Sequence, residues 1–135
     1  MTQRSTEAAS TAPTPAARLL PAGAPDTIRQ AAGWLRRGLP VVFPTDTVYG
    51  VGVLPFDAAA IDRLYTAKGR PAEKGIPILL ADAADLPLVA RDVPPVARTL
   101  MARHWPGPLT LVVPRRPELP DNLSPDDTVA VRVPD

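Results

Sequence analysis

The sequence contains no cysteine among its 135 residues. This absence excludes disulfides, thiolate zinc sites and a cysteine nucleophile, and it is compatible with a reducing compartment. Aromatic residues make up only 4% of the chain, and the formal net charge is +1. The chain as a whole therefore has no strong field for nucleic acid or an anionic membrane, although a local basic cluster is compatible with that total.

Long apolar runs are also missing. No stretch approaches the roughly 20 residues that a bilayer span requires, and the N-terminus lacks the apolar core of a signal peptide. Hydrophobic residues still make up 45% of the sequence, enough for one domain with a single core. We expect a soluble, cytoplasmic protein with no membrane partner.

Proline, in contrast, is abundant at 19 residues, and four of these lie within the first 25 positions. Residues 1–25 are rich in Ala, Thr and Pro and have little apolar periodicity, so we expect a disordered leader. The other prolines fall between apolar runs, where they end elements rather than interrupt them.

Residues 26–135 alternate between helical and extended patterns. Asp26 and Asp57 are expected to begin helices that Gly38 and Gly69 end, with Ile28 among the inward residues of the first helix. Further helices are expected near 83–90 and from Pro94 or Pro95 onward, the last with Val96 on its buried side. The expected extended segments are 39–43, 48–54, 76–80, 109–113 and 129–133. This order predicts an α/β or α+β fold, in which helices cover a sheet.

The last residues, Val133-Pro134-Asp135, directly follow an apolar strand. A domain rarely ends on a strand with no closing helix and no polar tail. We therefore interpret 26–135 as the N-terminal portion of a domain whose fold is incomplete in this chain.

A basic loop follows the second expected helix. Lys68, Arg70 and Lys74 are three cations within seven residues of the stretch "AKGRPAEKG". Arginine offers a planar fork and lysine a mobile charge, a combination that suits a polyphosphate. Cations near a helix C-terminus are also favoured by the helix dipole alone, so both interpretations stand on the residues themselves.

The stretch "VVFPTDTVYGVG" at 41–52 places a polar cluster after an apolar strand. Thr45, Asp46 and Thr47 either form an ordinary turn in which they bond their own backbone, or line a ligand site at a strand end. The two interpretations have about equal weight from local chemistry.

The segment "HWPGPLTLVV" contains His104, the one histidine of the chain. A lone histidine at a helix end is more often structural than catalytic. The residues that follow it, Trp105 to Pro108, are interpreted as a rigid connector that directs the next strand.

The final strand, "TVAVRVP", carries Arg132 within an otherwise apolar run. A guanidinium in a half-buried strand needs an anionic partner, either a carboxylate ligand or an internal Asp. Thr128 lies four residues earlier, an even offset that places it on the same strand face.

Together, "FPTDTVYGVG", "LYTAKGRPAEKGIPILLA", "HWPGPLTLVV" and "TVAVRVP" resemble the YrdC/Sua5 family in order and spacing, from about Leu39 to the last residue. The resemblance implies a YrdC/RibB-like fold, with a twisted mixed sheet flanked by helices. It also implies L-threonylcarbamoyladenylate synthase activity, a nucleotidyl transfer. The implied substrates are L-threonine, bicarbonate or CO₂, and ATP, with Mg²⁺. The implied product passes to t6A-pathway transferase proteins that modify adenosine 37 of tRNA, and tRNA itself is a further candidate partner.

Carried over by position, the resemblance implies that Thr47 contacts substrate threonine and that Arg132 binds its carboxylate. Thr45 and Asp46 would then shape the turn or meet solvent, and Gly50 and Gly52 would keep the backbone slim beside substrate. The implied ATP contacts are Lys68, Arg70, Lys74 and Thr128. No further catalytic residue and no protein metal site are implied.

Two departures from the family pattern stand out. Some relatives have a histidine that helps to bind threonine where this chain has Leu79, and the family's downstream S-x-N signature is absent. If the 135 residues are the whole product, we expect weak ATP binding, no turnover and poor solubility. The alternatives are a module that binds double-stranded RNA or tRNA, an inactive fragment, a YciO-type paralogue, or a YrdC-like domain of a carbamoyltransferase.

Overall fold

The computed structural model describes residues 17–135. Most of the leader predicted at 1–25 therefore lies outside the described residues. Within its described part, the backbone N–H of Ala24 donates to the carbonyl of Pro21 at 3.1 Å, and the Thr27 hydroxyl donates to the same carbonyl at 2.6 Å. These contacts form the turn that leads into the first helix.

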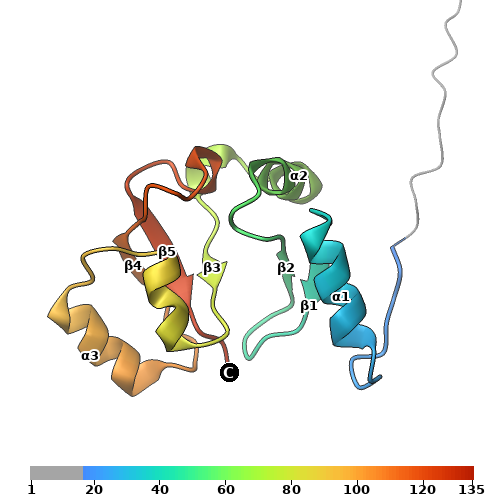
Figure 1. The fold of residues 1–135 in the computed structure, drawn as a ribbon, viewed down its shortest axis with the longest axis horizontal. Coiled ribbons are helices and arrows are strands. Elements are labelled where there is room, and N and C mark those ends of the chain that lie inside the picture. Colours follow the sequence, from blue (N-terminus) through green and yellow to red (C-terminus); the bar gives the residue numbers. More distant parts are fainter. Residues whose placement is uncertain (1–16) are drawn as a thin grey trace, which may run out of the picture.

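The described chain is a mixture of helices and short strands, which confirms the α/β class (Figure 1). The helices are α1 (Thr27–Arg36), α2 (Ala58–Lys68) and α3 (Pro95–His104), with 3₁₀ turns η1 (Ala72–Lys74), η2 (Ala83–Leu88) and η3 (Asp121–Leu123). The strands are β1 (Val41–Phe43), β2 (Gly50–Gly52), β3 (Ile78–Leu79), β4 (Leu111–Pro114) and β5 (Thr128–Arg132). Within this part of the chain, no helix is long and apolar enough to cross a membrane.

The strands form two separate sheets where one sheet was expected. β1 and β2 pair antiparallel, with Val41 opposite Gly52 and Phe43 opposite Gly50. The second sheet has the order β3-β5-β4, with β3 parallel and β4 antiparallel to β5, so the prediction of mixed strand directions is confirmed. Among the described strands, β2 and β3 each have one neighbour only, so the two sheets do not join into one.

The ends of α2 follow the sequence signals. Asp57 accepts a hydrogen bond from the Ala60 backbone at 3.0 Å, and Gly69 ends the helix in the left-handed conformation at φ 56°. α1 differs, because Asp26 makes no capping hydrogen bond from its side chain. The prediction that Ile28 faces inward is wrong, since it is 78% exposed and α1 contains no buried residue.

The later elements were predicted in place but differ in form. The segment near 83–90 is a 3₁₀ turn that begins after Asp82, whose carboxylate accepts from the Ala84 N–H at 2.7 Å. Pro95 begins α3 as expected, and Met101, also predicted on the buried side with Leu100, packs against the core. The prediction for Val96 is wrong, because Val96 is exposed and Ala97 is the buried residue. The segment expected to be extended over 48–54 keeps strand pairing only at Gly50–Gly52, because residues before it form the turn described below.

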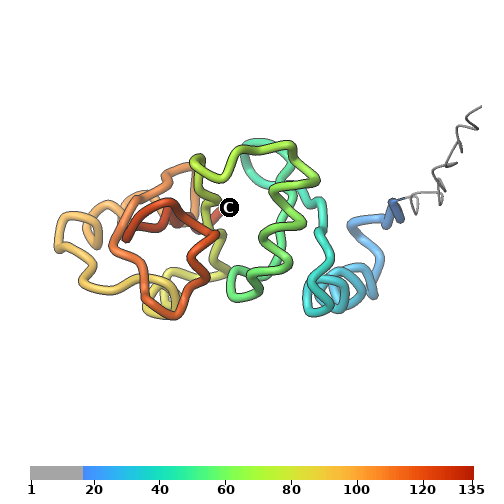
Figure 2. The backbone as a smooth tube through the Cα atoms, turned by 90° about the horizontal axis from the view of Figure 1, so that it is seen from above, coloured from blue at the N-terminus to red at the C-terminus, as the bar shows by residue number. Residues whose placement is uncertain are grey.

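The hydrophobic core lies in the larger part of the molecule. It contains Ile61 and Tyr65 of α2 and the inward residues of the β3-β5-β4 sheet, with η2, η3 and Ala97 of α3 packed around them. In contrast, α1, β1 and β2 contain no buried side chain. Figure 2 shows α1 toward one end of an elongated molecule, whereas the chain segments that form most of the core lie toward the other end.

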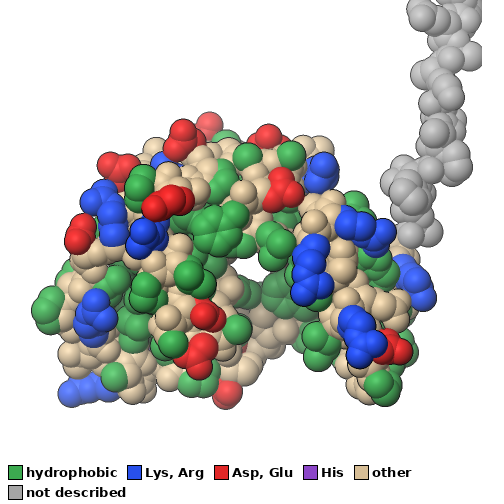
Figure 3. Space-filling view, viewed as in Figure 1, with side chains coloured by type: hydrophobic (Ala, Val, Ile, Leu, Met, Phe, Trp, Pro, Cys, Tyr) green, Lys and Arg blue, Asp and Glu red, His purple; other side chains and the backbone are tan. Residues whose placement is uncertain are grey.

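An opening separates the two sheets in the space-filling view (Figure 3). α2 closes it on one side, and on the other the chain's last residues lie between the β1–β2 connection and β3 (Figure 1). The α1–β1 connection is also tied to α2, since Arg63 Nη1 donates to the Gly38 carbonyl at 2.8 Å. This hydrogen bond adds a polar link to the apolar contact that Val53, directly after β2, makes with the core.

Candidate functional site

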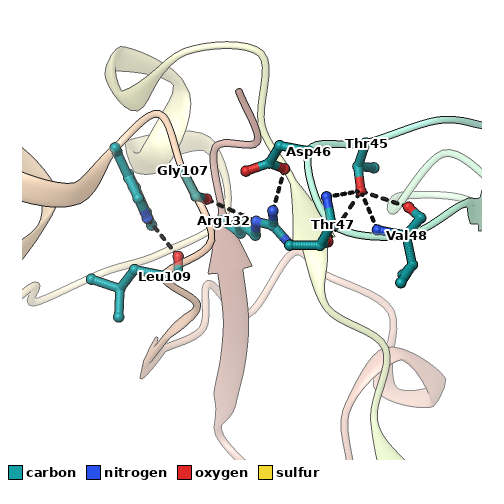
Figure 4. A network of polar contacts seen from close by, with 8 residues as sticks. Thr45, Asp46, Thr47, Val48, Gly107, Leu109 and Arg132 are labelled. Carbon is teal, nitrogen blue, oxygen red and sulfur yellow. Dashed lines mark hydrogen bonds and ion pairs between the residues drawn. The ribbon is translucent and has the colours of Figure 1, made fainter.

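The turn between β1 and β2 is organised by one hydroxyl. Thr45 Oγ1 donates to the Val48 carbonyl at 2.6 Å and accepts from the backbone N–H groups of Thr47 and Val48 at 3.3 Å each. This is the backbone-bonding turn that the sequence left as one alternative, and here Thr45 forms it. The side chains of Asp46 and Thr47 point toward Arg132 of β5 (Figure 4), and the Thr47 hydroxyl also lies 3.2 Å from Thr45 Oγ1, within hydrogen-bond distance.

Arg132 meets both of these side chains. Its Nη1 donates to Thr47 Oγ1 at 3.0 Å, and its Nη2 forms a hydrogen-bonded ion pair with Asp46 Oδ1. The Arg132 and Asp46 side chains are only 12% and 19% exposed. Of the two partners considered for this guanidinium, the structure therefore contains the internal aspartate. The expectation that Asp46 only shapes the turn or meets solvent is wrong, because β5 brings a cation to it.

Gly107 provides the third contact of Arg132. Its carbonyl accepts from Arg132 Nε at 2.8 Å (Figure 4). Its N–H donates to the Val133 carbonyl at 2.8 Å. A Cβ at Gly107, where φ is +156°, would lie 2.6 Å from the His104 carbonyl oxygen, so a side chain does not fit. The segment at 105–108 therefore holds Arg132 in place as well as directing β4.

The neighbouring residues of this segment have structural roles. Trp105 Nε1 donates to the Leu109 carbonyl at 2.7 Å, which fixes the connector before β4. His104 is the exposed last residue of α3. Its backbone carbonyl, rather than its ring, is the group that restricts Gly107.

Leu79 lies beside Arg132 in the sheet. The two residues are Cα partners in the parallel β3–β5 pairing, so their side chains point to the same face. The apolar residue noted in the sequence therefore forms part of the surroundings of the Arg132 guanidinium, at the end of the sheet that faces the 45–48 turn.

The two glycines of β2 have a packing role. A Cβ at Gly52 would lie 3.0 Å from Phe43 Cε1, and one at Gly50 would lie 3.4 Å from Phe43 Cε2. The ring of Phe43 thus covers the backbone of both residues across the strand pair. The expectation that these glycines leave room for substrate is wrong on this face, because the aromatic ring fills the space.

Arg70 binds its own loop. Its Nε donates to the Lys74 carbonyl at 3.0 Å and its Nη2 donates to the Gly75 carbonyl at 3.0 Å, so the guanidinium fixes the backbone that follows α2. Tyr65 lies under this loop, and burial raises the pKa of its phenol. Lys68 and Lys74, at the ends of α2 and η1, have exposed side chains.

Thr128 begins β5 and is bonded locally. Its hydroxyl donates to Asp126 Oδ1 at 2.6 Å, and this hydrogen bond lowers the pKa of the Asp126 carboxyl. Val129 and Val131 are buried whereas Thr128, Ala130 and Arg132 are half-buried, so the predicted shared face of Thr128 and Arg132 is confirmed.

The candidate site residues thus form two groups at opposite ends of β5. Thr47 and Arg132 meet at its last residue. The basic loop packs near the beginning of β5, where a Cβ at Gly75 would lie 3.3 Å from Pro125 Cδ and Ile76 N–H donates to the Leu123 carbonyl. Thr128 and Arg132 are four positions apart along an extended strand, a distance of about 13 Å. Within residues 17–135, no group of three or more His, Cys, Asp or Glu side chains is arranged to hold a metal ion.

The family sequence model of the Sua5, YciO and YrdC proteins, described as "Telomere recombination", matches residues 33–135. The chain belongs to the Sua5/YciO/YrdC family. The match covers all the site residues described above.

Several members of the Sua5/YciO/YrdC family are close in sequence. The threonylcarbamoyl-AMP synthase of Pyrococcus abyssi is 46% identical over 108 residues, which are 79% of this chain and 32% of that protein. The corresponding synthase of Bacillus subtilis is 43% identical over 113 residues, or 80% of this chain and 32% of that protein. For Pseudomonas aeruginosa the identity is 39% over 106 residues, 78% of this chain and 57% of that protein.

Solved structures of the family show the same fold. P. abyssi Sua5 complexed with L-threonine has a TM-score of 0.77 at 46% identity, covering 79% of this chain and 32% of that one. Escherichia coli YciO has a TM-score of 0.71 at 29% identity, covering 80% and 53% respectively. The chain therefore spans between about a third and three-fifths of the length of these relatives.

Two members of the Arg132 cluster were not assigned from the sequence. Asp46 lies between two threonines in the "PTDT" stretch, and this position beside Thr47 was the only sequence signal that it could belong to the site. Gly107 binds Arg132 through its backbone carbonyl, a group that every residue has, so residue type does not predict the contact. The one local signal is that this glycine lies between two prolines.

Proposed function

We propose that this chain carries the threonine-binding part of a threonylcarbamoyl-AMP synthase. The observation that supports this is the meeting of Thr47 and Arg132 at 3.0 Å across 85 residues of sequence. A hydroxyl and a half-buried guanidinium side by side suit the polar groups of a hydroxy amino acid. The P. abyssi Sua5 complexed with L-threonine, 46% identical to this chain, is consistent with that ligand.

In the proposed reaction, the amine of L-threonine attacks CO₂ from bicarbonate and forms a carbamate as it loses a proton. A carbamate oxygen then bonds to the α-phosphorus of ATP, and the bond to the bridging β-phosphate oxygen breaks. Pyrophosphate leaves with that oxygen, so the reaction is a nucleotidyl transfer. Catalysis of this kind depends on positioning two anions and neutralising charge on the phosphates.

Arg132 would hold the threonine carboxylate and Thr47 would contact the same amino acid. Lys68 and Lys74 have exposed ammonium groups suited to the ATP phosphates at the other end of β5. Arg70 could contact ATP only after its hydrogen bonds to the Lys74 and Gly75 carbonyls break. Thr128 could contact ATP only if its hydroxyl bonded both ATP and the Asp126 carboxylate. Mg²⁺ would enter with ATP, bound to the phosphate oxygens.

The product would serve the t6A modification of tRNA, through transferase proteins that accept the threonylcarbamoyl group. A YciO-type role is the second candidate, and the more distant identity of E. coli YciO, 29% against 46% for the Pyrococcus synthase, favours the synthase.

The test is binding of L-threonine to the 135-residue chain, measured by titration calorimetry, with L-valine as a comparison amino acid that lacks the hydroxyl. The proposal expects the chain to bind threonine more tightly than valine, and expects Thr47→Val to lose most of the threonine binding. Equal binding of the two amino acids would contradict the proposal, and so would unchanged threonine binding in Thr47→Val. Any pyrophosphate release from ATP should require both threonine and bicarbonate.

A further inference from the structure

The guanidinium of Arg132 has no free nitrogen. Nε donates to the Gly107 carbonyl, Nη1 to the Thr47 hydroxyl, and Nη2 to the Asp46 carboxylate. A carboxylate binds arginine best through two parallel hydrogen bonds from two neighbouring nitrogens. Nη1 and Nη2 each carry a second N–H, so an incoming carboxylate would share these nitrogens with the internal acceptors. Both two-nitrogen edges of the guanidinium include Nη2, the nitrogen that donates to Asp46.

Asp46 is the occupant that chemically matches such a ligand. It offers the same group, a carboxylate, to the same guanidinium. The other two acceptors, the Gly107 carbonyl and the Thr47 hydroxyl, are neutral groups, so neither competes with a ligand carboxylate by charge. Asp46 also lies in a turn whose hydrogen bonds are made by Thr45, so its side chain can rotate away while the turn remains intact.

We propose that Asp46 is an internal competitor for Arg132, which occupies the carboxylate position until a ligand carboxylate displaces it. This inference rests on the proposed function for the identity of the ligand, L-threonine. Two carboxylates at one arginine repel each other, and with side chains this little exposed the repulsion is weakly screened. Asp46 would therefore lower the affinity for threonine and restrict the Arg132 position to ligands that bind strongly enough to displace it.

The experiment measures carboxylate affinity in the full chain and in Asp46→Asn, which keeps the size of the side chain and removes its charge. Titrations with L-threonine and, separately, with acetate are followed through the Nε–H resonance of Arg132 by ¹H–¹⁵N NMR. An Arg132→Lys variant assigns that resonance. Circular dichroism melting checks that each variant is folded, and Asp46→Ala provides a second removal of the charge.

The control for the change of charge is Asp121→Asn. Asp121 pairs with Arg115 Nη2 at 2.7 Å, and the Arg115 side chain is 12% exposed, as is that of Arg132, although Asp121 itself is 97% exposed and Asp46 only 19%. Asp121→Asn changes the net charge by the same amount as Asp46→Asn, but it removes the carboxylate partner of Arg115 instead of that of Arg132. It should leave both affinities at Arg132 as they are in the unmodified chain.

The proposal expects Asp46→Asn to bind both carboxylates more tightly, by about fivefold or more, the lower end of typical coupling between two sites. Unchanged or weaker acetate binding in Asp46→Asn and Asp46→Ala would overturn it, because Asp46 would then position Arg132 rather than compete for it. Tighter acetate binding without tighter threonine binding would leave the competition standing and contradict threonine as the ligand, which separates this inference from the proposed function.

Discussion

Arg132 donates a hydrogen bond to the hydroxyl of Thr47 at 3.0 Å, although 85 residues separate them in the chain. Together with the adjoining pair between Arg132 and Asp46, this contact joins the last strand of the core to the turn of the smaller sheet. The same few atoms thus connect two parts of the fold and form the candidate ligand position. Stability and binding should therefore both respond to substitutions here.

Arg132→Ala should lower the free energy of unfolding by about 2 kcal/mol, because it leaves the little-exposed Asp46 carboxylate and the Gly107 carbonyl without their donor. Urea denaturation at neutral pH measures the loss. The control is Arg29→Ala, which breaks a pair with Asp26 whose side chains are 83% and 66% exposed and should cost under about 0.5 kcal/mol. Equal stabilities of the two variants would show that the Arg132 cluster does not hold the sheets together.

Gly107→Ala should destabilise the fold by about 2 kcal/mol or more, because the new Cβ would approach the His104 carbonyl to 2.6 Å at a positive φ. Gly33→Ala is the opposite case. Nothing lies within 4 Å of a Cβ at that position in α1, so alanine should add about 0.5–1 kcal/mol of stability through helix propensity. Thermal melting of both variants tests the pair, and a tolerated Gly107→Ala would disprove the close approach.

Thr128→Val should raise the pKa of the Asp126 carboxyl toward its ordinary value, because the Thr128 hydroxyl is the largest cause of its lowered pKa. A lowered pKa in the folded state stabilises the fold above the ordinary pKa of 3.8, and that contribution is lost as pH falls through the folded value. Carboxyl ¹³C shifts of Asp126 between pH 2 and 6 provide the measurement. An unchanged midpoint in Thr128→Val would mean that the hydroxyl does not set this pKa.

Tyr65→Phe should change the alkaline limit of stability. Burial raises the pKa of Tyr65 above 10.0, so the folded chain keeps its proton where the unfolded chain loses it. Stability contributed by the neutral phenol is complete below pH 10 and falls as pH rises through the folded pKa. We expect the two proteins to have similar unfolding free energies at pH 8 and the phenylalanine variant to lose less by pH 11. Parallel losses in both would contradict a buried phenol.

Arg70→Ala should loosen the loop after α2, because three carbonyl contacts of its guanidinium disappear from Lys74 and Gly75. Amide exchange across 70–76 should accelerate, whereas Lys68→Ala, which removes an exposed ammonium, should leave exchange there unchanged. If both lysine and arginine also contact ATP, both variants should weaken nucleotide binding. Equal exchange in the two variants would show that Arg70 does not organise the loop.

Local chemistry predicted those elements whose signals act within a few residues. Asp57 and Gly69 bracket α2 as expected, since a cap needs only neighbouring backbone groups. The inward placement of Ile28 failed for a different reason. The periodicity of α1 predicts an apolar face but not the presence of another element that covers it. In the described chain, no element packs over Ile28 closely enough to bury it.

The sequence by itself determined the family, the order of the elements and the residue types at the candidate site, including Thr47 on a turn and Arg132 in a half-buried strand. Only the tertiary structure decided what Arg132 binds. Asp46 lies 86 residues away, and its meeting with the guanidinium depends on how a two-stranded sheet with no buried side chains packs beside the core. Pairing of charges over that separation is fixed by the placement of whole segments, which no local pattern encodes.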